Sequence, residues 1–233
     1  MSKDKVDYVD LIYGNENPRT PKTEYPDKLI NYLIKAYGIG ENLKVLDVGC
    51  GRGDFLNAFI EAGLEGYGVD YSDAAVEHCP NATIRKADLE NDEIPFKNDT
   101  FDVVFSKSVL EHFHNPEVPV GEMYRVLKPG GLIISMVPSW EYCWDIYFED
   151  YTHRTPFMLS AFRDLHILQG FSDVDTKFFT QLPATWNDPS RVWTLLSKLT
   201  RILAPSVLRY RYKWVRFSKE IMLICTATKR NKI

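Results

Sequence analysis

The stretch VLDVGCGRGDF, residues 45–55, decides the fold. An apolar run typical of a β-strand ends at Val48, three glycines follow at alternate positions, and apolar residues at helical spacing begin at Phe55. Because glycine adopts positive φ and lets another molecule approach the main chain, this turn indicates a ligand-binding loop at a helix N-terminus. The spacing differs from the dinucleotide fingerprint G-x-G-x-x-G. Asp47 would repel a pyrophosphate and suits an ammonium or hydroxyl group better, which disfavours a nicotinamide cofactor.

Strand-like and helix-like segments alternate along most of the chain. Strands are expected at residues 43–49, 66–70, 82–87, 101–107, 131–137, 171–179 and 220–228, and helices at 25–37, 53–63, 73–79, 117–127 and up to 169. This alternation predicts a parallel sheet with right-handed crossovers, in which ligands bind outside the carboxyl ends of the strands. Asp47, Asp70 and Asp88 fall at such ends, so one shared pocket is expected. Residues 128–131, Lys-Pro-Gly-Gly, predict a turn between helix and strand.

Composition points to one globular domain with decoration. The chain has 233 residues, of which 45% are hydrophobic. Its first ten residues lack the apolar core of a signal peptide, and no window contains about 18 uncharged apolar residues, so a cytoplasmic protein is expected. The four cysteines are scattered without C-x-x-C spacing, which argues against zinc and disulfides, and no metal ligand is predicted.

Four blocks, taken together, resemble the class I S-adenosylmethionine-dependent methyltransferases, in the group with a type 11 methyltransferase domain. They are VLDVGCGRGDF at 45–55, GVDYS at 68–72, ADLENDEIPFKNDTFDVVFSKSVLEHF at 87–113 and LKPGGLIISMVP at 127–138. The blocks occur in the family's order, and the resemblance covers roughly residues 25–180. It implies an α/β fold with a doubly wound, mostly parallel seven-stranded sheet whose last strand is antiparallel. It also implies S-adenosylmethionine as cofactor.

The resemblance assigns cofactor-binding roles to residues at the strand ends. Gly49, Cys50 and Gly51 would line the methionine part of the cofactor, with Asp47 near its amino group. Asp70, followed by Tyr71, would take the ribose hydroxyls. Asp88 and Leu89 would flank the adenine, and Ser106 and Lys107 would lie beside the methionine end. An acid after a strand also commonly caps a turn or a helix, and this alternative is strongest for Asp88.

Two histidines are candidate catalytic residues. His153 lies in an aromatic, acid-rich stretch after the fifth strand, where it could deprotonate an acceptor hydroxyl, with Asp150 orienting it. The alternative is that His153 and Arg154 only fix the loop by hydrogen bonds. His112, in VLEHF, is a pocket residue by resemblance, and a structural role is an equal alternative.

The acceptor is expected to be a small molecule. The block DYTHRTPF, residues 150–157, resembles methyltransferases that modify cell-surface polysaccharides, which favours O-methylation of a saccharide or sugar nucleotide. A lipid or quinone acceptor and a non-catalytic binding subunit are the alternatives. Methylation of DNA amino groups is disfavoured, because the N/D-P-P-Y/F box of those enzymes is absent after the fourth strand, where residues 106–109 read SKSV.

We expect an N-terminal arm at residues 1–24 and a methyltransferase domain at 25–233, with a basic, aromatic insertion at about 180–219. Residues 189–219 contain eight basic residues and no acidic one, and residues 191–203 have the spacing of an amphipathic helix. The insertion could be a lid with solvated charges, a contact for an anionic membrane surface or a site for a phosphate-bearing substrate. Nucleic acid is an unlikely partner, because one basic patch stands on an acidic chain.

Overall fold

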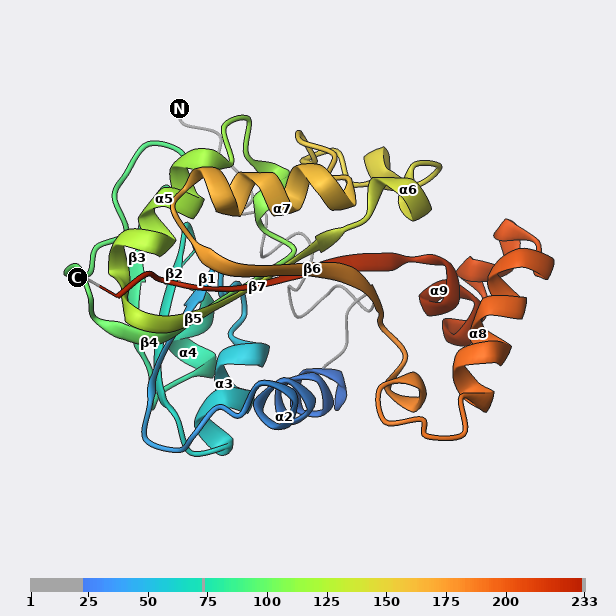
Figure 1. Cartoon of the computed structure of the whole chain (residues 1–233), viewed down its shortest axis with the longest axis horizontal. Coiled ribbons are helices and arrows are strands. Elements are labelled where there is room, and N and C mark those ends of the chain that lie inside the picture. Colours follow the sequence, from blue (N-terminus) through green and yellow to red (C-terminus); the bar gives the residue numbers. More distant parts are fainter. Residues whose placement is uncertain (1–22, 73, 232–233) are drawn as a thin grey trace, which may run out of the picture.

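The computed structural model describes residues 23–72 and 74–231, and a seven-stranded sheet forms its centre (Figure 1). The strand order is β3-β2-β1-β4-β5-β7-β6. The strands are β1 (Lys44–Val48), β2 (Glu65–Asp70), β3 (Thr83–Lys86), β4 (Phe101–Lys107), β5 (Leu127–Pro138), β6 (Ser172–Thr180) and β7 (Ile221–Thr228). Strand β7 is antiparallel to both of its neighbours, and the other paired strands run parallel. The predicted fold class is therefore confirmed. The arm expected at residues 1–24 lies, except for its last two residues, outside the described residues.

Helices cover both faces of the sheet. Below it in Figure 1 lie α2 (Tyr25–Tyr37), α3 (Asp54–Glu61) and α4 (Ala74–His78), and above it lie α5 (Glu117–Val126), α6 (Trp140–Cys143) and α7 (Leu159–Leu168). On the α2 side, Leu29, Leu33 and Phe59 pack against strand residues such as Phe105. On the α7 side, Met123 and Phe162 belong to a second apolar cluster. Burial of these two clusters fixes the layers.

Helix α2 forms at the residues expected from its sequence, 25–37. Pro26 lies in its first turn, where the missing N–H costs nothing, and Leu29, Ile30 and Leu33 are buried on one side. The helix ends at Gly38, which has φ 64° and donates its N–H to the carbonyl of Ile34. A left-handed residue at this position favours glycine.

The prediction that residues 128–131 form a turn is wrong. They belong to β5, which begins at Leu127 opposite Phe101 and resumes its regular pairing with β4 at Leu132. The extra residues bulge out of the ladder, and Gly130 has φ 75° there. The Gly130 N–H donates to the carbonyl of Lys229 (2.8 Å), so a segment 99 positions away makes this stretch part of the sheet.

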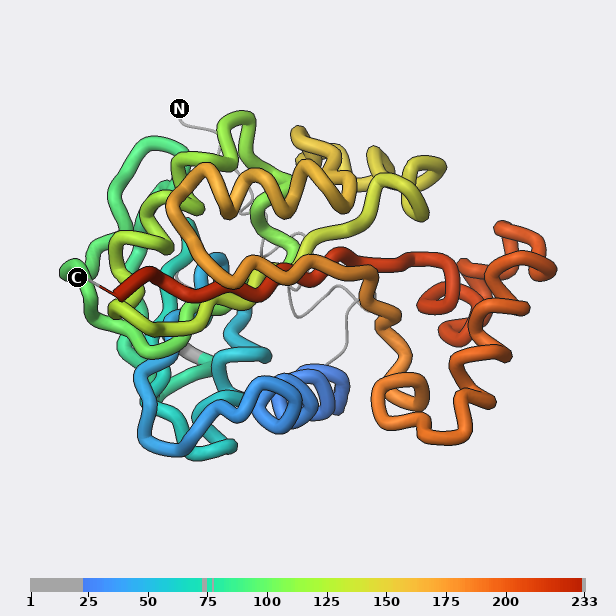
Figure 2. The backbone as a smooth tube through the Cα atoms, viewed as in Figure 1, coloured from blue at the N-terminus to red at the C-terminus, as the bar shows by residue number. Residues whose placement is uncertain are grey.

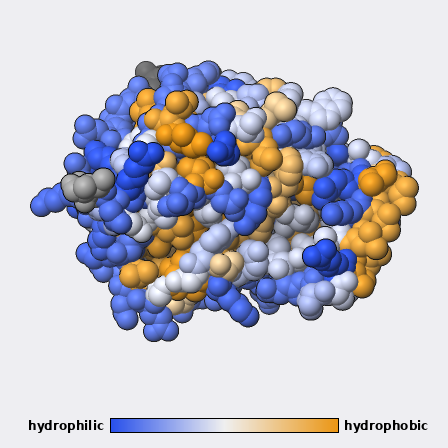
Figure 3. Space-filling model, in the orientation of Figure 1, coloured by the Kyte–Doolittle hydropathy of each residue, from blue (hydrophilic) through white to orange (hydrophobic). Residues whose placement is uncertain are grey.

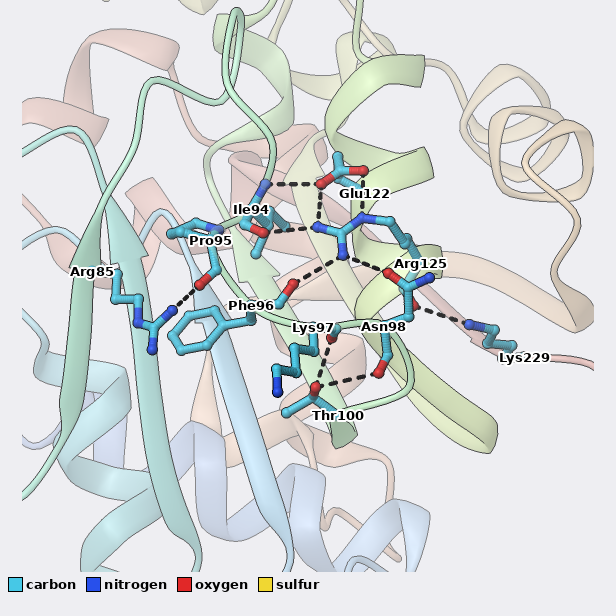
Figure 4. Close-up of polar contacts among 10 residues, drawn as sticks. All are labelled: Arg85, Ile94, Pro95, Phe96, Lys97, Asn98, Thr100, Glu122, Arg125 and Lys229. Carbon is cyan, nitrogen blue, oxygen red and sulfur yellow. Dashed lines mark hydrogen bonds and ion pairs between the residues drawn. The ribbon is translucent and has the colours of Figure 1, made fainter.

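Arg125, on α5, anchors the loop that precedes β4 (Figure 4). Its guanidinium donates to the carbonyls of Ile94 and Phe96, at 2.8 and 2.9 Å, and is held by the carboxylate of Glu122 at 2.6 Å. The Lys229 ammonium in turn donates to the Arg125 carbonyl at 3.1 Å. One arginine thereby satisfies main-chain carbonyls of a segment that has no regular secondary structure.

A helical segment joins β6 to β7, and we call residues 181–220 the β6–β7 insertion. It contains η3 (Pro183–Thr185), α8 (Val192–Leu203), η4 (Ser206–Tyr210) and α9 (Lys213–Lys219). Figure 2 shows it in orange and red beyond the carboxyl ends of the parallel strands. Trp186 attaches it to the domain: its ring packs on Tyr32 and its Nε1–H donates to the Thr180 carbonyl at 2.7 Å.

Candidate functional site

The three glycines after β1 have different tasks. All have positive φ: 74° at Gly49, 53° at Gly51 and 84° at Gly53. A Cβ atom on Gly49 would lie 2.3 Å from a methyl carbon of Val109, and one on Gly53 would lie 2.1 Å from the sulfur of Cys79. These two glycines permit close packing within the protein. A Cβ on Gly51 would meet nothing within 4 Å, so Gly51 is the position where the loop faces open space.

Asp70 connects the glycine loop to the end of β2. Its Oδ2 accepts the Gly51 N–H at 2.8 Å, and its Oδ1 accepts the Ser72 N–H at 2.9 Å. The adjacent loop donors also have partners, since the N–H groups of Gly49 and Cys50 both donate to the Val69 carbonyl. The acid and the loop form one preorganised unit at the carboxyl edge of the sheet.

Asp47 and Ser106 lie directly under this edge. Both are almost fully buried, and neither Oδ2 of Asp47 nor Oγ of Ser106 has a hydrogen-bond partner among the described residues. Burial, with a smaller contribution from the charge of Asp70, raises the pKa of Asp47 to about 8. A carboxylate in this position favours a cationic hydrogen-bond donor, which would pair with Oδ2 and stabilise the charged form.

A cavity of about 1010 Å³ lies above these residues. The predicted site residues that line it are Gly49, Cys50, Gly51, Asp70, Lys107, His112 and His153. Burial lowers the pKa of Lys107 to about 8, against the opposite effect of Glu111, and raises the pKa of Cys50. The Lys107 ammonium lies 5.3 Å from the ring centroid of Phe55, so an aromatic face borders the cation.

Five predicted cofactor residues lie outside the lining of this cavity: Asp47 and Ser106, which lie under the sheet edge, and Tyr71, Asp88 and Leu89. The Asp88 carboxylate accepts the Glu90 N–H (3.1 Å) and the side-chain amide of Asn91 (2.9 Å), which is the turn-capping alternative. Leu89 is buried in the apolar cluster on the α7 side, and the Tyr71 side chain is 66% exposed. Their contacts to a cofactor stay predictions.

A polar cluster forms the floor of the cavity on the side of η1 (Leu110–His112). Glu111 and His112 come from η1, and His153 comes from the loop after η2 (Tyr147–Glu149). The ring centroids of His112 and His153 lie 4.9 Å apart. The Nε2 atom of His153 lies 3.9 Å from Oε1 of Glu111 and also 3.9 Å from Oδ2 of Asp150. Asp150 lies beside His153 on the side of Nε2, whereas Nδ1 bonds the Tyr147 carbonyl at 2.6 Å, so the orienting role expected of Asp150 stays a prediction.

Burial dominates the protonation of this cluster. It lowers the pKa of His112 to about 4 and lowers the pKa of His153, so both imidazoles are neutral at pH 7. It raises the pKa of Glu111 to about 8, although the Lys107 charge opposes this. Shifted groups that face one cavity are typical of a functional site.

The β6–β7 insertion closes the outer side of the cavity. Arg209, which is 5% exposed, makes a two-pronged contact with Asp145, at 2.7 and 3.2 Å. The Tyr210 hydroxyl donates to Glu149. Arg211, Lys213 and Arg216 contribute further positive charge to the lining. Four basic residues of the insertion thus line the cavity, and two of them, Arg209 and Arg216, are in ion pairs, with Asp145 and Glu220.

Sequence reasoning missed Glu111 and Arg209. Glu111 stands in the apolar context VLEHF at the end of the fourth strand, and an acid between apolar residues is a signal of burial that could have identified it. Arg209 carries no comparable signal, because its partner Asp145 is 64 positions away.

Comparison with known proteins identifies the domain. The family described as "Methyltransferase domain" matches residues 46–135. A sterol 24-C-methyltransferase of Schizosaccharomyces pombe is 32% identical over 112 residues, which cover 44% of this chain and 29% of that protein. A demethylmenaquinone methyltransferase of Staphylococcus aureus is 31% identical over 134 residues, covering 50% and 54%. The chain spans about a third to half the length of such curated relatives.

Solved structures share the fold at low sequence identity. Phosphoethanolamine N-methyltransferase 2 of Haemonchus contortus, in complex with S-adenosyl-L-methionine, has a TM-score of 0.67 at 21% identity and covers 96% of this chain and 56% of that one. A methyltransferase-like protein of Bacillus halodurans has a TM-score of 0.59 at 22% identity, covering 87% and 99%. Within residues 23–72 and 74–231, the helices lack the length and apolarity needed for a membrane crossing.

Proposed function

Because the chain belongs to the class I S-adenosylmethionine-dependent methyltransferases, we propose that it methylates a small-molecule acceptor bound in the 1010 Å³ cavity. The residues present fit the cofactor. Gly51 offers open space at the loop, Asp70 stands at the sheet edge, and Asp47 has a buried oxygen that lacks a hydrogen-bond partner in the described part of the chain and suits an ammonium group. When bound, S-adenosylmethionine supplies a methyl group that its sulfonium has already activated. The protein contributes alignment of acceptor and methyl group.

The acceptor class we propose is a saccharide or sugar nucleotide, methylated on oxygen. The observation that carries this proposal is the group of charged and polar side chains that line the cavity away from the glycine loop, among apolar residues such as Ile146 and Met222. Carboxylates, imidazoles and cationic side chains face it there, and the residues concerned are Glu111, His112, Glu149, Asp150, His153, Arg211, Lys213 and Arg216. Hydroxyl groups can both donate and accept, so such a wall suits a sugar, and the cationic groups suit an attached phosphate.

His153 is the proposed general base. Its Nδ1 hydrogen-bonds the Tyr147 carbonyl at 2.6 Å and so carries the proton, which leaves Nε2 as the accepting nitrogen on the cavity side. A base at this point would take the proton of the acceptor hydroxyl as methyl transfer proceeds.

The test is transfer of tritiated methyl groups into sugars, sugar nucleotides, lipids and small metabolites by the full chain. We expect label in a saccharide, with turnover reduced by about 100-fold in His153→Ala and unchanged binding of S-adenosylmethionine. Label only in lipids or quinones would reject the saccharide. Absence of cofactor binding in a direct titration would reject the enzyme and favour a non-catalytic binding subunit.

A membrane-associated acceptor, such as a lipid or quinone, is the second candidate, and α8 favours it. Figure 3 shows an apolar band over this helix at the outer end of the β6–β7 insertion. Exposed fractions are 57% for Leu195, 76% for Ile202 and 74% for Leu203. Lys198 on α8 and Arg211 in the same insertion are exposed too, and apolar and basic residues together are a composition that binds anionic membrane surfaces.

Co-sedimentation with phosphatidylcholine vesicles, with and without phosphatidylglycerol, tests this candidate. We expect binding only to the anionic vesicles, with weakening by salt and by the double substitution Ile202→Gln, Leu203→Gln. Leu168→Gln is the matched control, because Leu168 is 80% exposed on α7, away from the insertion. Equal sedimentation of wild type and the α8 variant would reject the membrane contact.

A further inference from the structure

We propose that Glu111, His112 and His153 bind a first-row divalent cation, such as Zn²⁺, at the floor of the cavity. One potential ligand atom of each residue lies within 4.8 Å of the other two, and all three residues line the cavity. The inference rests on the proposed methyl transfer to a small-molecule acceptor, since the cation would meet the acceptor there, and it replaces the base role of His153 by a ligand role.

Glu111 provides the first argument. Its side chain is fully buried, and neither carboxylate oxygen has a hydrogen-bond partner among the described residues. Buried carboxylates in folded proteins are almost always paired or bound to metal, because an uncompensated one is costly. A cation between Glu111 and the imidazoles would compensate this group.

The hydrogen bonds of the two histidines fix their tautomers. The Thr152 hydroxyl donates its one proton to Asp150 at 2.6 Å, so in its 2.8 Å contact with His112 it accepts from Nδ1–H. His153 donates Nδ1–H to the Tyr147 carbonyl at 2.6 Å. In both rings Nε2 is then the deprotonated nitrogen. Metal-binding histidines commonly show this arrangement, with the second nitrogen bonded to a carbonyl, carboxylate or other polar group.

Main-chain contacts hold the two contributing segments together. The N–H groups of Arg154 and Thr155 both donate to the Glu111 carbonyl, at 2.7 and 3.0 Å. His153 is therefore brought to Glu111 by the backbone, although the two residues are 42 positions apart. A ligand set positioned in this way needs little reorganisation to bind a cation.

The ligand types select the metal class. Two imidazoles and one carboxylate suit Zn²⁺ and its neighbours in the first transition row, whereas Mg²⁺ prefers oxygen ligands. Around such an ion, ligand atoms lie about 3 to 3.5 Å apart. Binding of the cation therefore requires the ligand atoms to move by about 1 Å through side-chain rotation. The remaining coordination positions face the cavity, where acceptor hydroxyls can occupy them.

The cation changes the role of His153. A coordinated Nε2 cannot accept a proton, so His153 acts as a ligand in the loaded protein. The cation would lower the pKa of the acceptor hydroxyl that it binds, so that this hydroxyl would lose its proton to solvent water in the cavity while its oxygen takes the methyl group from the sulfonium. Metal dependence thus separates this mechanism from catalysis by a free imidazole base.

The test is calorimetric titration of the tag-free, chelator-treated full chain with ZnCl₂, together with the visible absorption of the Co²⁺-loaded protein. We expect one Zn²⁺ per chain and ligand-field bands with Co²⁺. The affinity should fall by at least about 100-fold in Glu111→Gln and His153→Gln. His114→Gln is the matched control, because this exposed histidine lies two positions beyond the cluster, and it should bind as the wild type does.

Thermal unfolding and circular dichroism distinguish loss of a metal ligand from misfolding of a variant. Zn²⁺ should raise the melting temperature of wild type and His114→Gln but not that of Glu111→Gln, whose circular dichroism should match wild type. Absence of stoichiometric binding by wild type, or equal binding by Glu111→Gln and His153→Gln, would overturn the cation site. S-adenosylmethionine is titrated into the same samples. Binding of the cofactor without binding of Zn²⁺ would reject the cation site alone. Binding of Zn²⁺ without binding of the cofactor would reject the proposed function alone.

Discussion

The main-chain N–H of Gly51 donates to Oδ2 of Asp70 at 2.8 Å, so the loop after β1 and the end of β2 are joined at the edge where the cavity opens. The contact links the two parts of the sequence that first indicated a ligand site, 19 residues apart. Asp70 has two tasks in consequence: it shapes the glycine loop, and it presents a carboxylate to the cavity.

Asp70→Asn is expected to weaken binding of S-adenosylmethionine by at least about 10-fold. The substitution removes the negative charge of the side chain. It also replaces one carboxylate oxygen, which accepts a hydrogen bond, by an NH₂ group that would face the N–H of Gly51 or of Ser72. Isothermal titration of the purified chain measures the effect. Glu65→Gln, an exposed change on the same strand, should bind normally. Normal affinity of Asp70→Asn would contradict the assignment of this acid to the cofactor.

Gly49→Ala is expected to destabilise the fold by roughly 2 kcal/mol or more, through positive φ and the clash with Val109. Adding Val109→Ala should restore part of this loss, because it removes the methyl carbons at 2.3 and 2.8 Å. Gly51→Ala should cost only about 1 kcal/mol for its backbone conformation. Urea unfolding of wild type, Gly49→Ala, Val109→Ala, the double variant and Gly51→Ala checks the comparison, and additive effects of Gly49→Ala and Val109→Ala would show that the steric explanation is wrong.

Arg125→Met is expected to lower the free energy of unfolding by roughly 2 to 4 kcal/mol, because the carbonyls of Ile94 and Phe96 and the carboxylate of Glu122 lose their shared donor. Denaturant titration gives the difference. Arg163→Met is the control, since Arg163 is largely exposed on α7 and should change stability by less than about 0.5 kcal/mol. A change of less than about 0.5 kcal/mol in the free energy of unfolding of Arg125→Met would mean that Arg125 does not stabilise the loop before β4.

His166 should make the protein sensitive to mild acid. Its ring is fully buried, with Nδ1 bonded to the Phe162 carbonyl (2.8 Å) and Nε2 to the Ser135 hydroxyl (3.1 Å), and burial lowers its pKa from 6.5 to about 4. Because the unfolded chain binds the proton more readily, this residue reduces stability as the pH falls from 6.5 to about 4 and has no such effect above pH 6.5. The full loss is about 3 kcal/mol.

Comparison of wild type with His166→Gln isolates this contribution. We expect the difference in unfolding free energy between the two proteins to shift in favour of the variant between pH 7.5 and pH 4.5, measured by urea titration at each pH. A difference that does not change with pH would show that His166 does not exclude the proton.

Local patterns predicted the strands of the sheet and part of the lining of the cavity. The strand at 101–107 and the helix at 25–37 formed at those residues, because alternation, helical spacing and glycine punctuation are properties of short segments. The gathering of Asp70, Gly51 and Lys107 at one edge followed from the rule that parallel strands end together. Local patterns failed at residues 128–131, where the helix-to-strand turn expected from Pro and Gly became a bulge paired with the end of the chain.

The sequence by itself determined a doubly wound sheet with a glycine loop and acids at its carboxyl edge, because those features depend on neighbours a few residues apart. Only the tertiary structure decided that the Glu111 carboxylate has no hydrogen-bond partner within residues 23–72 and 74–231, that His153 lies 3.9 Å from it, and that Arg209 pairs with Asp145. Burial and pairing arise between segments 40 or more residues apart, and no local pattern encodes the distance between them.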